Sequence, residues 1–259
     1  MLRYKTLEID RLQAYFGEPF VIDTENTLGS ITINQPTVGQ LMKLGETNFF
    51  SSLNVFINNT TSYMVMLDEA GIDWNDISDF ELFITLYRTL QKEPCEILFG
   101  DLDFQKFELM KKVVEDKEVI VLVNKEQNIE IDELVYQYIH QYLQYVFNIF
   151  PEERIIRNTM LKRTWLSKER QKIEIEKKKI EDGDKKTSSM QSVISACVNH
   201  PGFKYKLSEV KDMKICEFYD SVKRLQLYEN ATACLKGLFS GMVDGSKIDA
   251  DSYNFMKDI

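Results

Sequence analysis

Closely spaced carboxylates are the residues of this chain that could do chemistry, because oxygen ligands at alternating positions are what a calcium loop requires. The densest group is Asp73-Trp74-Asn75-Asp76-Ile77-Ser78-Asp79. An EF-hand loop needs a ligand at its fifth position and a glycine at its sixth, where this chain has Ile77 and Ser78. The stretch therefore predicts a turn in which Trp74 packs, followed by a helix cap, and not a metal site.

The remaining candidates for chemistry are two shorter acidic groups and the two histidines. Gly100-Asp101-Leu102-Asp103 is typical of a turn, and Asp182-Gly183-Asp184 of a solvated linker. His140 lies within a predicted helix and His200 precedes a proline, so both are interpreted as structural or surface residues. No phosphate-binding glycine loop, nucleophile elbow, H-E-x-x-H or kinase signature occurs. We therefore predict a protein that is not an enzyme and has no catalytic residue, cofactor or metal.

The composition is that of a globular protein and argues against nucleic acid as a partner. Of the 259 residues, 44% are hydrophobic and 28% charged, and the net charge is −9. Neutralising phosphates requires a basic surface, which this balance does not provide. Residues 162–186 are locally basic, with ten Lys/Arg against six Asp/Glu, but their charges alternate and they lack interleaved aromatic residues after Trp165. We interpret them as a solvated helix or linker.

Neither disulfides nor a membrane span is expected. The four cysteines (Cys95, Cys197, Cys216 and Cys234) are far apart and have apolar neighbours, which favours reduced, buried thiols. Residues 134–151 carry no formal charge over 18 positions, but they include three glutamines, a histidine and an asparagine. The first ten residues lack the apolar segment of a signal peptide. We therefore expect a soluble protein in the cytoplasm.

The predicted fold is mainly α, of the α+β type, in three parts. Residues 1–155 form an N-terminal mixed domain, 156–188 a charged helical linker, and 189–259 a C-terminal helical domain. Apolar spacing, caps and turns define the elements. They are β-type runs at 20–22, 31–33, 118–123 and 129–131, and helices over 38–57 (weakened at Gly45), from the Ser78 capping box to Pro94, over 132–150 (capped by Asp132), over 190–198, from a Ser208 cap, and over 215–240 with Gly241 at the end.

The helix over residues 132–150 is the best candidate for binding another protein. One stripe of it is polar but uncharged, and tyrosines flank that stripe, a composition that interfaces favour. The same face could instead pack against its own domain, and helical spacing does not distinguish the two. Replacing Gln137 with Glu, Gln141 with Lys and Gln144 with Glu is predicted to leave folding intact and to abolish partner binding, whereas lost soluble expression would indicate core. The candidate binding residues are Tyr136, Gln137, Gln141, Gln144, Tyr145 and Asn148.

Two parts of the chain carry distinctive motifs. In and directly after residues 31–103 they are Gln35-Pro36-Thr37, Gly45-Glu46, Gly71-Ile72-Asp73-Trp74, Ser78-Asp79-Phe80-Glu81-Leu82-Phe83 and Phe99-Gly100-Asp101-Leu102-Asp103-Phe104, and near the C-terminus they are Ile194-Ser195-Ala196, Asn199-His200-Pro201-Gly202-Phe203-Lys204-Tyr205 and Asp220-Ser221-Val222-Lys223-Arg224-Leu225-Gln226. Together these motifs resemble a family of morphogenesis proteins in tailed bacteriophages and prophages of Gram-positive hosts.

The resemblance implies a tail assembly chaperone, a non-enzymatic factor that holds the tape-measure protein until tail-tube subunits arrive. It implies no catalytic residue, and the cytoplasm of the bacterial host as the location. The alternative is a structural virion subunit of the neck, tail or baseplate, which would remain in the particle. Self-association is open under both interpretations.

Overall fold

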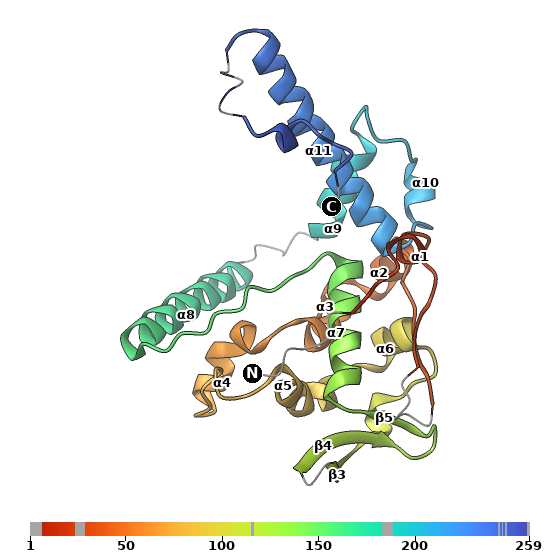
Figure 1. The fold of residues 1–259 in the computed structure, drawn as a ribbon, viewed down its shortest axis with the longest axis vertical. Helices are drawn as coiled ribbons and strands as arrows, with labels where there is room; N and C mark the ends of the chain where they lie inside the picture. The colour runs from red at the N-terminus through yellow and green to blue at the C-terminus, as the bar shows by residue number, and fades with distance from the viewer. Residues whose placement is uncertain are drawn as a thin grey trace.

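The predicted mainly helical α+β class is confirmed (Figure 1). The computed structural model describes residues 7–23, 29–114, 117–182, 189–242, 244, 246 and 248–257. Its α-helices are α1 (Arg11–Tyr15), α2 (Val38–Leu44), α3 (Glu46–Ile57), α4 (Met64–Glu69), α5 (Asp79–Leu86), α6 (Lys92–Phe99), α7 (Glu133–Phe147), α8 (Thr159–Glu181), α9 (Ser189–Val198), α10 (Leu207–Val210) and α11 (Ile215–Phe239), and its strands are β1 (Phe20–Ile22), β2 (Ile31–Ile33), β3 (Glu108–Val114), β4 (Lys117–Asn124) and β5 (Ile129–Ile131).

Helix α7 is the centre of the core. It runs between the β3–β5 sheet at one end and α11 at the other, and packs along α3 (Figure 1). Aromatic rings make much of this contact: Phe49 of α3 lies 5.7 Å from Phe147 of α7, and Phe83 of α5 stacks on Tyr136 at 4.8 Å. On the other side, Phe20 of β1 stacks on Tyr142 at 4.4 Å. Burying these rings is a main source of stability for the fold.

All four predicted strands are confirmed, and a fifth was missed. Strands β1 and β2 pair antiparallel, with Val21 opposite Thr32. A second antiparallel sheet has the order β3-β4-β5. Strand β3 escaped prediction because Lys111 and Lys112 interrupt the apolar alternation that marks a strand.

The helix predicted over residues 38–57 is two helices. Gly45 separates α2 from α3 with a φ of +94°, a conformation that side chains with a Cβ rarely adopt. Thr37 begins α2 with a full capping box, in which its hydroxyl accepts from the Gln40 N–H and the Gln40 side chain accepts from the Thr37 N–H. The glycine that was predicted to weaken one long helix therefore separates two helices.

The Ser78 capping box is confirmed, but the predicted end of its helix is wrong. Ser78 Oγ accepts from the Glu81 N–H at 3.2 Å, and the Glu81 carboxylate accepts from the Ser78 N–H at 2.7 Å. Helix α5 ends at Leu86, well before Pro94. Pro94 instead lies in the first turn of α6, where backbone N–H groups have no helical partner and a proline costs no hydrogen bond.

The charged segment is a helix, as predicted, and a small separate cluster holds it in place. Leu166 is the one residue of α8 that is buried. It packs with residues of α4, α5 and the turn between them, where Trp74 donates its indole N–H to the Arg154 carbonyl at 3.2 Å. Arg154 in turn stacks 3.9 Å above the Trp165 ring, and Lys162 pairs with Asp73. The packing predicted for Trp74 is therefore confirmed.

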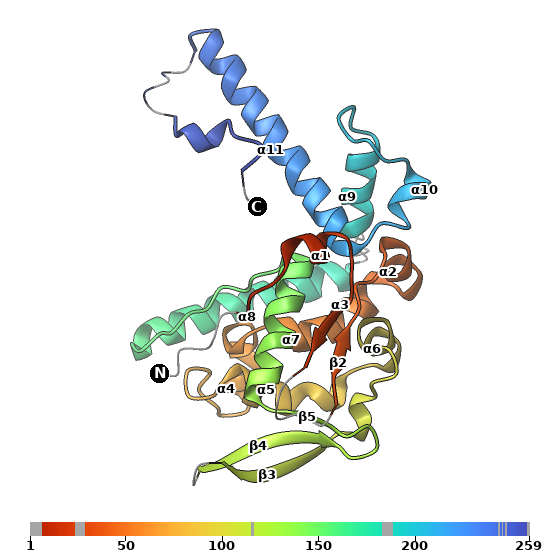
Figure 2. The same ribbon diagram turned by 45° about the vertical axis from the view of Figure 1, so that its right-hand side comes forward.

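Helices α9 to α11 share the main core with the N-terminal part, through Met190, Ile194 and Phe218 among others. The helix predicted from a Ser208 cap starts two residues earlier, at Leu207, with Lys206 at the cap position. Gly241 follows α11 with a φ of +71°, as its position predicted. The predicted boundaries of three domains stay a prediction. The far half of α11 extends away from the body (Figure 2).

Candidate protein-binding surface

The polar stripe of α7 faces inward over much of its length. Tyr136 and Gln137 are buried, and Gln141 and Gln144 are half-buried. Tyr136 stacks on Phe83, and burial raises its pKa well above the usual value. The Gln141 side chain accepts from the Leu7 N–H at 3.0 Å. These contacts show what Tyr136 and Gln141, two of the six predicted binding residues, do within the chain itself.

The side chains of His140 and Gln144 cap backbone carbonyls at the C-terminal end of α3. A helix leaves its last carbonyls without partners, and buried carbonyls need them. His140 Nδ1 donates to the Phe56 carbonyl at 2.7 Å, and Gln144 Nε2 donates to the Ile57 carbonyl at 2.8 Å. The second Gln144 proton points to His140 Nε2, 2.9 Å away, which must then be the acceptor. This arrangement requires a neutral His140 and explains an uncharged stripe without any partner.

Acid should destabilise the protein through His140. Burial lowers the pKa of its imidazole in the folded chain, so below the ordinary value of 6.5 the unfolded chain takes up more protons. The stabilisation is complete above pH 6.5 and declines as the pH falls below it. Urea titrations between pH 7.5 and pH 5 should show the free energy of unfolding decreasing, and His140→Gln should flatten this slope. An equally steep slope in the variant would contradict the assignment.

Tyr145 and Asn148, the remaining two predicted binding residues, lie where α7 meets α11. Asn148 is exposed and ends α7 in the left-handed conformation, with a φ of +50°. Its Oδ1 atom accepts from Lys223 Nζ of α11 at 3.4 Å. Together with Cys216 these residues line a shallow pocket of about 110 Å³. Asn148, at the end of the stripe, is thus exposed to solvent, whereas Tyr145 is half-buried.

Exposed apolar side chains gather at the far end of the chain. We call residues 228–242 and 248–257 the C-terminal arm. The side chains of Phe239, Met242 and Met256 are 83%, 87% and 76% exposed. Apolar groups this accessible, on an element that stands away from the body, are typical of binding surfaces (Figure 2). Helical spacing had marked the apolar residues of α11 but gave no sign that this half leaves the core.

The arm is an ordered structure. Residues 248–257 lie beside α11, and Arg224 of this helix donates to the Phe255 carbonyl at 3.0 Å and to the Lys257 carbonyl at 2.6 Å. The Tyr228 and Phe255 rings meet edge to face at 5.5 Å. The exposed apolar groups therefore stand on a helix and a returning segment that hold each other in place.

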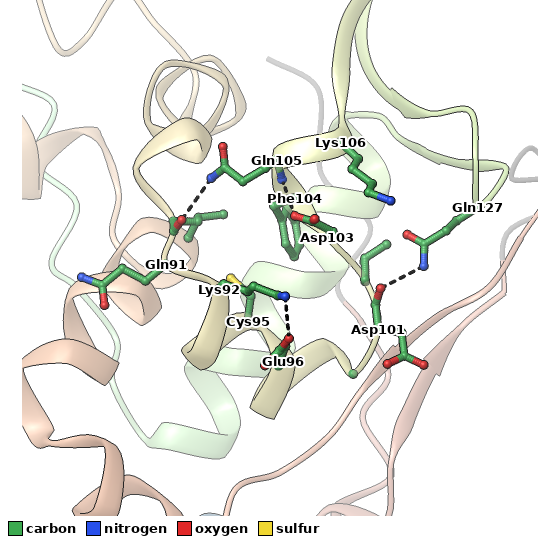
Figure 3. Close-up of a pocket in the computed structure, with 13 residues that line it drawn as sticks. Gln91, Lys92, Cys95, Glu96, Asp101, Asp103, Phe104, Gln105, Lys106 and Gln127 are labelled. Carbon is green, nitrogen blue, oxygen red and sulfur yellow. Dashed lines mark hydrogen bonds and ion pairs between the residues drawn. The ribbon is translucent and has the colours of Figure 1, made fainter.

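A pocket of about 280 Å³ lies beside α6 and is a poor candidate for a ligand site (Figure 3). Its polar groups bind one another: Lys92 pairs with Glu96 at 3.4 Å, and Gln127 donates to the Asp101 carbonyl at 3.0 Å. Cys95 lines it, but burial raises the pKa of this thiol to about 12, so it stays protonated. The Leu102 N–H donates to the Phe99 carbonyl at 3.4 Å across Gly100 and Asp101, which confirms the predicted turn.

The acidic stretch around Trp74 is used for local structure. Asp73 accepts from the Asn75 N–H at 3.0 Å, and its contact with Lys162 lowers the pKa of its carboxyl. Asp79 accepts from the Thr60 N–H at 2.8 Å. Within the described ranges, no three His, Cys, Asp or Glu side chains come together as metal ligands would. Nor does that part of the chain contain a helix with the length and apolar character to cross a membrane.

One comparison with known proteins is informative. The family model described as the YomV second domain, a phage-associated family, matches residues 179–259. This segment contains α9, α10, α11 and the C-terminal arm. No curated protein and no solved structure was found to match the chain.

Proposed function

We propose that this chain is a non-enzymatic protein-binding factor of phage virion morphogenesis, and specifically a tail assembly chaperone that holds the tape-measure protein. The observation that carries the proposal is the C-terminal arm, whose exposed apolar side chains lie within the segment that matches the phage-associated YomV second domain. The motifs that resemble phage morphogenesis proteins support the same class of function.

The proposed mechanism is physical. A tape-measure protein is long and helical, and its apolar stripes would aggregate if they stayed exposed before assembly. Phe239, Met242 and Met256 offer apolar area without charge, so they can cover such a stripe and release it when tube subunits compete for it. The net charge of −9 would keep the complex soluble. Affinity would come from several weak contacts along one partner.

The first test compares purified phage particles with the lysate that produced them, by quantitative mass spectrometry. A chaperone is expected to be abundant in the lysate and missing from the particles. A fixed copy number retained in the particles would contradict the chaperone and make the protein a structural virion subunit of the neck, tail or baseplate.

A variant of the arm tests the proposed surface. The double substitution Phe239→Asp and Met242→Asp should abolish co-purification of the tape-measure protein with a tagged chain, because it places charges in the apolar contact. Met160→Asp is the matched control, since Met160 is 80% exposed on α8, outside the arm. Equal recovery of the tape-measure protein with both variants would rule out the arm as its binding surface.

A further inference from the structure

The outer edge of β3 is open. In the part of the chain that the structure describes, β3 pairs with β4 alone, and β4 separates it from β5. The hairpin of β3 and β4 projects at the end of the body opposite α11 (Figures 1 and 2). An edge strand of seven residues offers a row of unpaired backbone groups to another strand.

The direction of these backbone groups follows from the start of the strand. The Phe107 carbonyl accepts from Arg88 at 2.9 Å, outside the sheet. Because backbone groups alternate in direction along a strand, Leu109, Lys111 and Val113 point their N–H and C=O groups to the open edge, while the residues between them bond to β4.

The side chains at this edge are unusually apolar for an exposed hairpin. Leu109 is 52% exposed and Val113 69%, and Met110 and Ile120 are exposed as well. Natural edge strands usually avoid this, because an apolar open edge invites pairing. Charged residues do occur in β3, but their order places opposite charges across from each other when two copies of the strand pair antiparallel.

Antiparallel pairing of β3 with β3 of a second copy, centred on Met110, satisfies both backbone and charge. Glu108 then lies opposite Lys112 of the second copy, and Lys112 opposite Glu108. Leu109 of one copy lies opposite Lys111 of the other. The backbone N–H and C=O groups of both residues point to the open edge, so these two residues can exchange backbone hydrogen bonds. Centring the pair on Lys111 instead would set two lysines face to face, which is unfavourable.

We infer that two copies of this chain associate through their β3 strands, forming one continuous six-stranded antiparallel sheet. The salt bridges that Glu108 and Lys112 form within one chain are compatible with this association. Glu108 contacts Lys125 at 2.6 Å and Lys112 contacts Glu130 at 3.1 Å, both as solvent-exposed pairs. The association extends them into a network of alternating charge. It is independent of the proposed function, although a dimer would present two arms to one partner.

Charge exchange across the interface tests the register. Sedimentation velocity over a wide range of concentration should show a monomer–dimer equilibrium for the wild type. Glu108→Lys and Lys112→Glu should each weaken self-association about tenfold or more, because each creates two like-charged cross-strand pairs. An equimolar mixture of the two variants should recover a dimer of wild-type strength, since every pair in the mixed dimer is again opposite in charge.

A second variant keeps the test independent of side-chain charge. In Lys111→Pro the lost N–H points to the open edge, so the β3–β4 pairing is kept and dimerisation is lost. Unchanged circular dichroism would verify the fold. A wild type that stays monomeric at high concentration would overturn the inference. So would dimerisation that Lys111→Pro and both charge variants leave unchanged, because the contact would then lie elsewhere.

Discussion

Phe56→Ala is expected to lower the free energy of unfolding by about 3–5 kcal/mol, the usual cost of removing a buried phenylalanine ring. Phe56 has no exposed surface. Its ring lies 5.0 to 5.5 Å from three others, those of Phe83, Phe99 and Phe104, which come from three different elements. Neighbours that are fixed on separate elements cannot easily close a cavity, so we expect the upper part of this range.

Urea unfolding followed by circular dichroism measures this loss. The midpoint should fall while the dependence on urea concentration stays the same. Phe150→Ala is the matched control, because Phe150 is 64% exposed and its replacement should change stability by less than about 0.5 kcal/mol. Similar losses in both variants would show that Phe56 is not the centre of the core.

Gln144→Glu is expected to destabilise the protein by about 2–3 kcal/mol at pH 8, because a half-buried carboxylate would replace a paired donor. Gln144 donates to the Ile57 carbonyl and to His140. A glutamate at this position turns an acceptor toward the Ile57 carbonyl and leaves His140 Nε2 without its donor. The penalty arises from lost donors and from charge, since the two side chains have nearly the same size.

The pH dependence distinguishes this variant from a general loss of packing. Lowering the pH from 8 to 6 should return part of the stability, because a proton taken up by the introduced carboxylate or by His140 restores a donor between them. The wild type should not gain stability over the same range. Gln171→Glu is the matched control, since Gln171 is exposed on α8. Equal effects at positions 144 and 171 would contradict the capping role of Gln144.

The triple variant Gln137→Glu, Gln141→Lys and Gln144→Glu should therefore lose soluble expression. The sequence predicts intact folding and lost partner binding for this variant, but the contacts of Gln141 and Gln144 within the chain favour the core. An uncharged polar stripe can bind a protein partner, and it can equally donate hydrogen bonds to the carbonyls at the end of a neighbouring helix. Only the position of α3 decides between them, and that position depends on contacts distant in sequence.

Local chemistry made much of the fold predictable. The Ser78 box, the Asp132 cap and Gly241 each act within four residues, so sequence alone placed the ends of three helices correctly. Where an outcome depended on distant packing, prediction failed. Pro94 was predicted to end the helix that follows Ser78, but it lies in the first turn of the next helix, α6. The charges of β3 concealed a strand that pairs with β4.

The candidate surface was the least predictable part. Apolar residues at helical spacing indicate burial, and nothing in residues 215–240 reveals that a side chain such as Phe239 is exposed. Exposure is a property of the whole arrangement, whereas periodicity describes a single element. The C-terminal arm therefore emerged only from the three-dimensional structure, and the open edge of β3 likewise.

The small cluster that packs α8 against the body determines what the intrinsic tryptophan fluorescence of this protein reports. The chain has two tryptophans, and both belong to this contact: Trp74 from the turn beneath α8, and Trp165 from α8 itself, under Arg154. Intrinsic fluorescence excited at the indole band therefore reports on the packing of α8 against the body and does not report on the main core. Both fluorophores lie where a separation of α8 from the body would be visible without any label.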